Sequence, residues 1–201
     1  MSQRQPIQPT SARGQRSRQK LLDAARQVFL DVGYGDANAT AITSAAGVSY
    51  GSFYVYFTSK EELFTELARE LLEEVYVASR APTEVKDPVQ RITTENGRFF
   101  EVYREHAAMF QMIEEVIRLD ADFRDEWRQI RRKNIDRLAR GLRRLQKSGA
   151  ITVGLDVEYV ADALGGLAER MAYLSTLDDG FDVERRLETL NEIWRQTLGL
   201  G

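Results

Sequence analysis

The sequence of 201 residues contains no cysteine, which excludes disulfide bridges, thiol catalysis, thiolate zinc sites and iron–sulfur clusters. It contains one histidine, His106, so a histidine-rich metal site or a metalloprotease helix is excluded as well. We therefore expect no metal and no cofactor. His106 lies between Glu105 and Ala107 at the expected start of a helix, where a surface or helix-capping role is expected.

Long apolar runs are also absent, and none approaches the roughly 18 residues that a membrane span needs. A signal peptide is not expected, because Asp23, Arg26 and Gln27 interrupt the segment from Leu21 to Leu30. These absences favour a cytoplasmic protein with no membrane partner.

Basic residues are slightly fewer than acidic ones in the chain as a whole, which holds 28 Lys and Arg against 31 Asp and Glu and has a formal net charge of −3. The distribution of charge is uneven, since residues 1–60 hold seven basic and three acidic side chains. The first 20 residues hold five basic groups and no acidic one. A basic end of this kind indicates an anionic partner, although short basic tails without a function are also common.

The apolar residues repeat with helical spacing along most of the chain, and no segment shows the period-2 alternation of a strand. The sequence therefore predicts an all-α protein of about nine helices. We expect three parts: a disordered basic arm over residues 1–15, a helix-turn-helix DNA-binding domain over 16–60, and a helical ligand-binding and dimerisation domain over 61–201. Helices are expected from Ser17 to Gly33, from Ala39 to Ala46, from after Ser49 through Tyr56, from Ser59 to about Ser79, from Pro88, from Ala107 to Leu119 and from about Asp122 to Lys147, followed by two more before the C-terminus. The residues expected to cap helix starts with their side chains are Asn38, Ser49, Asp87, Asp156 and Asp182.

The segment from Asn38 to Lys60 contains two short helices joined by Gly47-Val48-Ser49, a turn of helix-turn-helix length. Such a unit places its second helix in the major groove of DNA. Phe53 and Phe57 would anchor that helix in the core. Gly51 would let the backbone approach DNA, and the helix would carry hydroxyls on its other positions. The residues expected to face DNA are Thr40, Ser49, Tyr50, Gly51, Ser52, Tyr54, Tyr56 and Lys60, unless the tyrosines are ordinary surface or interface groups.

The segment from Ser17 to Glu70 resembles the DNA-binding domain of TetR-family transcriptional regulators. The resemblance rests on Ser17-Arg18-Gln19-Lys20-Leu21-Leu22-Asp23-Ala24-Ala25, Phe29, Gly33-Tyr34, Ile42, Ala46-Gly47-Val48-Ser49, Gly51-Ser52-Phe53-Tyr54, Tyr56-Phe57 and Ser59-Lys60-Glu61-Glu62-Leu63. The aromatic content of the C-terminal part and the Ala-Glu-Arg run at 168–170 are similar to the EthR-like branch, whose pockets take lipophilic molecules.

The resemblance implies that Thr40 and the start of the recognition helix contact operator DNA. It implies that Tyr54 and Tyr56 hold phosphates and that Lys60 completes the contact with the DNA backbone. Two residues depart from the family pattern: Tyr50 replaces a frequent Lys, Arg or Gln, and Thr58 replaces a frequent proline. A bidentate contact with guanine is therefore not available at position 50.

The C-terminal part is rich in aromatic and methionine side chains, which are typical of a pocket for a small lipophilic effector and equally of a packed core. Asn96 and Asn134 interrupt apolar stripes, so each is expected to meet a ligand, a water or the other amide. The predicted ligand-binding residues are Asn96, Phe99, Tyr103, Phe110, Ile113, Trp127, Ile130, Asn134 and Met171.

Small residues between Ala161 and Ala172, together with the last helix, predict a homodimer interface formed by the last two helices. This is also where the resemblance places the family's dimer interface. The prediction is a repressor that binds a palindromic operator and is released by a small lipophilic ligand. The alternatives are an all-helical enzyme or carrier for a lipophilic molecule, for which no convincing catalytic set is present, and an adaptor that binds protein partners.

Overall fold

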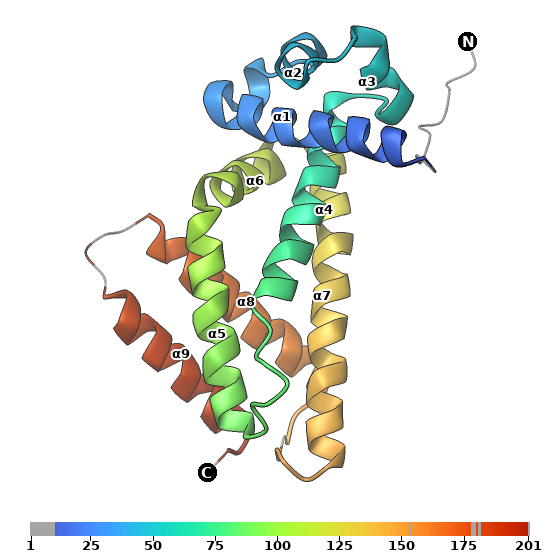
Figure 1. Cartoon of the computed structure of the whole chain (residues 1–201). Helices are drawn as coiled ribbons and strands as arrows, with labels where there is room; N and C mark the ends of the chain where they lie inside the picture. The colour runs from blue at the N-terminus through green and yellow to red at the C-terminus, as the bar shows by residue number, and fades with distance from the viewer. Residues whose placement is uncertain (1–10, 153, 178–179, 181, 201) are drawn as a thin grey trace. The chain divides into compact units, whose positions relative to one another are not determined.

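The computed structural model describes residues 11–152, 154–177, 180 and 182–200. Within these residues it contains nine α-helices and no strand, which confirms the predicted all-α class (Figure 1). None of the described helices is long and apolar enough to cross a membrane. The helices are α1 (Ala12–Asp36), α2 (Ala39–Ala46), α3 (Tyr50–Tyr56), α4 (Lys60–Ala78), α5 (Pro88–Glu105), α6 (Ala107–Leu119), α7 (Ala121–Lys147), α8 (Val157–Ser175) and α9 (Val183–Thr197).

Several helix starts carry the caps that the sequence predicts. The side chain of Asn38 accepts a hydrogen bond from the Ala41 amide at 3.0 Å, and Asp87 accepts one from Gln90 at 2.7 Å. Asp156 and Asp182 cap α8 and α9 in the same way. Each cap satisfies amides that have no partner within the helix, and this fixes where the helix begins.

Helix α1 begins earlier than predicted. Its first residue is Ala12, capped by the side chain of Ser11, so residues 12–15 are helical and not part of a disordered arm. The rest of the predicted arm, residues 1–10, lies outside the described part of the chain. The predicted end at Gly33 is a kink, because Gly33 has a non-helical backbone with φ +81°, a value that favours glycine, and α1 continues beyond it to Asp36.

The chain divides into two compact units. The first contains residues up to Leu71 together with Met112–Trp127, and the second contains Leu72–Gln111 and the residues from Arg128 onward. The first unit thus extends past the predicted domain boundary at residue 60 and includes parts of α4, α6 and α7.

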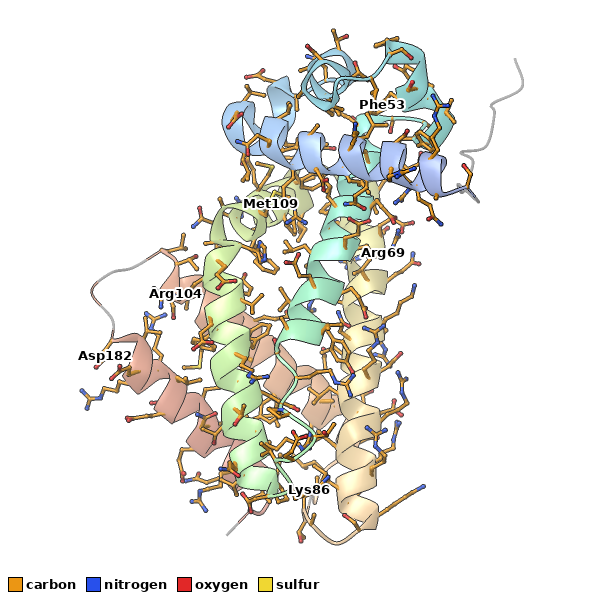
Figure 2. The ribbon with its side chains drawn as sticks, viewed as in Figure 1. Phe53, Arg69, Lys86, Arg104, Met109 and Asp182 are labelled. Carbon is orange, nitrogen blue, oxygen red and sulfur yellow. The ribbon has the colours of Figure 1, made fainter. Side chains whose placement is uncertain are left out.

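The core of the first unit is aromatic. Phe64 of α4 contacts Phe29 of α1 and Phe123 of α7, with ring centroids 5.1 and 5.0 Å apart. Helices α2 and α3 lie on the same side of α1 (Figure 1). Phe53 of α3, labelled in Figure 2, is fully buried, and its ring centroid lies 5.9 Å from that of the buried Phe57. This packing fixes the position of α3 within its own unit.

In the second unit, α5 packs against both α8 and α9, and these two helices also contact each other. The stacked rings of Tyr103 and Phe110, 3.9 Å apart, join the end of α5 to the start of α6. Leu164 of α8 and Leu190 of α9 are buried in the same unit.

Candidate nucleic-acid interface and effector domain

The turn between α2 and α3 is formed at Gly47. Gly47 ends α2 in the left-handed conformation with φ +64°, and its amide donates to the carbonyl oxygen of Ser44 at 3.2 Å. Glycine adopts this conformation without the steric cost that a side chain would bring. The predicted turn at Gly47-Val48-Ser49 is therefore present in the structure.

Helix α3 has a buried face and an exposed face. Phe53 and Phe57 are 0 % and 1 % exposed, so together they hold the helix against the core of its unit. Tyr50 and Tyr54 are 53 % and 46 % exposed. The predicted DNA contacts that are exposed are Thr40, Ser49, Tyr50, Gly51 and Tyr54, while Ser52, Tyr56 and Lys60 are partly exposed.

The hydroxyl groups of α3 are hydrogen-bonded in pairs. The Ser49 and Ser52 hydroxyl oxygens lie 2.8 Å apart, and those of Tyr50 and Tyr54 lie 2.9 Å apart. The prediction that Ser49 caps α3 through its side chain is wrong, because its hydroxyl makes no capping bond and pairs with Ser52 instead. The hydrogen bond with Tyr50 raises the pKa of Tyr54.

Lys60 has partners that the sequence did not indicate. Its ammonium group donates to the carbonyl oxygens of Tyr34, Gly35 and Ala37 at 2.8, 3.0 and 3.0 Å. It also lies 5.0 Å from the centre of the Tyr34 ring. Three hydrogens and three acceptors account for its full donor capacity, so a contact with phosphate would compete with these bonds.

The basic residues at the start of α1 fall into two groups. Arg18 is engaged within its unit, 2.8 Å from Glu66 and over the Phe57 ring at 5.2 Å. Arg13, Arg16 and Lys20 are exposed on the same helix. The exposed group is the one available to an anionic partner.

The predicted ligand-binding residues do not all belong to one unit. Ile113 and Trp127 belong to the first, and the other seven belong to the second. Among these seven, Tyr103, Phe110 and Ile130 are almost fully buried, and Phe99 and Met171 are partly exposed.

The two asparagines have separate partners. The Asn96 amide, 6 % exposed, donates to the Asn191 side-chain oxygen at 2.9 Å, which links α5 to α9. Asn134 is partly exposed and accepts from Arg137 at 3.1 Å, since the buried stripe of α7 runs one residue later, through Ile135. The prediction missed Asn191, although it sits next to the buried Leu190 in the pattern of the last helix.

Trp194 supplies a further buried polar group in the second unit. The Nε1 atom of Trp194 on α9 is buried without a hydrogen-bond partner among the described residues, and Trp194 is 6 % exposed. An unpaired donor of this kind costs about 1–3 kcal/mol.

His106 is the C-cap residue of α5, and its Nε2 atom lies 3.2 Å from Glu74. Across the described ranges no group of three or more His, Asp or Glu side chains could hold a metal ion.

Two family profiles match the chain. "Bacterial regulatory proteins, tetR family" matches residues 21–67, and "Transcriptional regulator EthR, C-terminal domain" matches residues 92–198. The second match alone covers more than half of the chain. The first match covers both helices of the helix-turn-helix, α2 and α3, and the buried residues of α1.

Two curated relatives that match over most of their length are HTH-type transcriptional regulators. The chain is 28% identical over 193 residues to the HTH-type transcriptional repressor AcnR of Corynebacterium diphtheriae, covering 90% of this chain and 92% of that protein. It is 28% identical over 168 residues to the HTH-type transcriptional regulator YdgC of Bacillus subtilis, covering 80% and 81%.

Solved structures share the fold. GusR of Salmonella enterica superposes with a TM-score of 0.76 at 22% identity, covering 92% of this chain and 96% of that one. The TetR-family repressor FadR of Thermus thermophilus, in complex with lauroyl-CoA, gives 0.65 at 22% identity, covering 90% and 94%. The family consists of transcriptional regulators and not enzymes, which removes the enzyme alternative. The chain belongs to the TetR family and is a DNA-binding transcriptional regulator with an EthR-like C-terminal domain.

Proposed function

We propose that this protein is a cytoplasmic repressor that binds a pseudo-palindromic operator as a homodimer and leaves it when a small lipophilic effector binds. The observation that carries the proposal is the exposed hydroxyl-rich face of α3, opposite two phenylalanines that are almost completely buried. A short helix held in this way can enter the major groove without losing its packing.

Within this proposal the exposed residues divide into two roles. Tyr50, Gly51, Ser52 and Tyr54, in the first turns of α3, face base edges. Tyr54 joins this group instead of the phosphate contacts that the resemblance implies, because its hydroxyl is paired with that of Tyr50. Thr40, Ser49 and Tyr56 bind backbone phosphates through their hydroxyls, a common use of such groups. Lys60 is assigned to the corner between α1 and α2, because its three hydrogens are donated there.

The proposed dimer interface is the exposed side of α8 and α9. Tyr159 of α8 is 77 % exposed and Ile193 of α9 is 37 % exposed. Ala163 and Gly166 follow Tyr159 at helical spacing and are small enough to let a second helix approach. The same surface on two chains can pair about a twofold axis, as the symmetry of a palindromic operator requires.

The proposed effector-binding region lies in the second unit, where aromatic side chains of α5 and α6 meet. A lipophilic molecule with a hydrogen-bond acceptor suits this unit, since the unpaired Trp194 donor is buried in it. Such a molecule favours a conformation that does not bind DNA only to the extent that it binds this conformation more tightly than the DNA-binding one.

A gel shift with the DNA flanking the protein's own gene tests the proposal. Wild-type protein should retard this DNA at 50 mM salt and bind it more weakly at 200 mM salt. Lauroyl-CoA, used as a lipophilic probe, should release the DNA, and coenzyme A alone should leave the complex intact. Retardation that neither probe changes would reject lauroyl-CoA as an effector and leave the DNA-binding part in place.

A further inference from the structure

Tyr50 and Tyr54 form one fixed unit on the exposed face of α3. Their hydroxyl oxygens are 2.9 Å apart, and their ring centroids are 5.3 Å apart with an angle of 65° between the planes. The Tyr54 ring also meets the buried Phe53 ring, with a centroid distance of 5.2 Å. In the protein without DNA, Tyr50 is therefore held by Tyr54, and Tyr54 is held by both Tyr50 and Phe53.

The hydrogen bond within the pair changes what it can offer to a base. Two separate tyrosines provide two hydroxyl hydrogens, but here one is used inside the pair and a single donor remains. Most of the surface that the pair exposes consists of ring carbon and hydrogen. A methyl group placed at Gly51, between the two tyrosines, would meet nothing within 4 Å, so space is open beside Tyr50.

Thymine is the base that presents an apolar group, its 5-methyl, in the major groove. We propose that the Tyr50/Tyr54 pair packs against the 5-methyl group of a thymine in each half-site and thereby selects that base. The inference rests on the proposed function, in which α3 enters the major groove. The inference adds to that function the base that α3 recognises, thymine, and the group on it that the two tyrosines contact.

The test begins with duplexes selected from a random pool by the full-length protein. Each thymine of the selected half-site is then replaced by uracil, which removes the methyl and keeps the base pair. Affinities are measured by fluorescence anisotropy at fixed salt. At one thymine per half-site we expect about a fourfold loss, as for one buried methyl group, and about fifteenfold when both half-sites are changed.

Protein variants show which side chain causes the loss of affinity when thymine is replaced by uracil. For Tyr50→Ala, the ratio of the affinity for the thymine duplex to the affinity for the uracil duplex should fall to about one at that position. In the control Val55→Ala, at a residue of α3 that is 41 % exposed and has no proposed contact with DNA, this ratio should stay at its wild-type value. If Tyr50→Ala binds too weakly, the DNA itself provides the second measurement: a C·G pair in place of that T·A pair should weaken binding, and 5-methylcytosine should restore about fourfold.

Two failures are distinguishable. If no duplex is enriched from the pool, the proposed function is wrong. If a duplex is bound selectively but no thymine-to-uracil change weakens binding, the methyl contact is wrong and the proposed function stands.

Discussion

Lys60 links the start of α4 to the end of α1 through the carbonyl oxygens of Tyr34, Gly35 and Ala37. These carbonyls follow the break at Gly33, where backbone acceptors at a helix end lack partners within the helix. A cation is favourable at that end of a helix. Lys60, which the sequence predicts to contact phosphate, therefore joins α1 to α4 within the protein itself.

Replacing Lys60 with Met keeps the apolar stem and removes the three hydrogen bonds. We expect a loss of about 1–3 kcal/mol in the free energy of unfolding by urea. We also expect an unchanged slope of log affinity against log salt. The exposed Lys86, labelled in Figure 2, is the matched control, and Lys86→Met should change neither quantity. Unchanged stability with a slope lower by about two per dimer would assign Lys60 to the phosphates instead.

Tyr34 should titrate at higher pH than an ordinary tyrosine. Burial, followed by the negative charges of Glu61 and Asp120, raises the pKa of Tyr34 from 10.0 to about 12. Because the folded state keeps this proton more tightly than the unfolded state, its contribution to stability is complete below pH 10 and is lost as the pH rises to about 12.

Absorbance titration of the phenolate checks this value. Tyr34→Phe should remove a transition near pH 12, whereas Tyr159→Phe, at a site that is 77 % exposed, should not affect it. A wild-type titration that is complete below pH 11 would contradict the assignment.

The basic residues near the start of α1 are either paired with an acidic residue or exposed to solvent. Arg18 is paired with Glu66, whereas Arg13, Arg16 and Lys20 are exposed on its first turns. These three groups give the helix free positive charge at the end that precedes the helix-turn-helix unit.

Changing Arg13, Arg16 and Lys20 together to Gln should weaken binding to all DNA sequences and reduce the salt slope by up to about 5 per dimer. The matched control changes Lys133, Arg140 and Lys147 of α7 to Gln, with the same change in net charge. Equal effects of the two triple variants would show that overall charge, and not α1, sets the affinity.

The helices themselves followed from local patterns. Asn38, Asp87, Asp156 and Asp182 were predictable as caps, because a capping side chain acts on amides two or three residues away. The partners of Lys60 and Asn96 were not predictable, since Tyr34 and Asn191 are distant in sequence. The pairing of the α3 hydroxyls depends on rotamers, so the sequence indicated which residues are exposed but not that they bind each other.

For the molecule as a whole, the positive charge in excess is concentrated in the first 60 residues. Residues 1–60 carry a surplus of four positive charges and the remaining residues a surplus of seven negative ones. The part that we propose to meet DNA is therefore the basic part. Exposed Tyr159 and Ile193 lie on α8 and α9, in the acidic part, where the proposal places the second chain.

Introducing a charge at Tyr159 tests the dimer. Light scattering of Tyr159→Arg should give the mass of one 23.0 kDa chain where the wild type gives two, and affinity for the operator should fall at least about tenfold. Leu119→Arg is the control, because Leu119 is 73 % exposed on α6 outside the proposed interface. A wild-type mass of one chain would contradict the dimer directly.

The proposed function requires that α3 recognises a defined operator sequence. The most direct measurement of this recognition is the equilibrium affinity of the full-length protein for the most enriched duplex from a random pool, compared with a shuffled duplex of the same composition. We predict an inverted repeat in the enriched sequence, two chains per duplex, and affinity at least about a thousandfold higher than for the shuffled duplex. Equal affinity for the two duplexes would show that the protein does not select a DNA sequence.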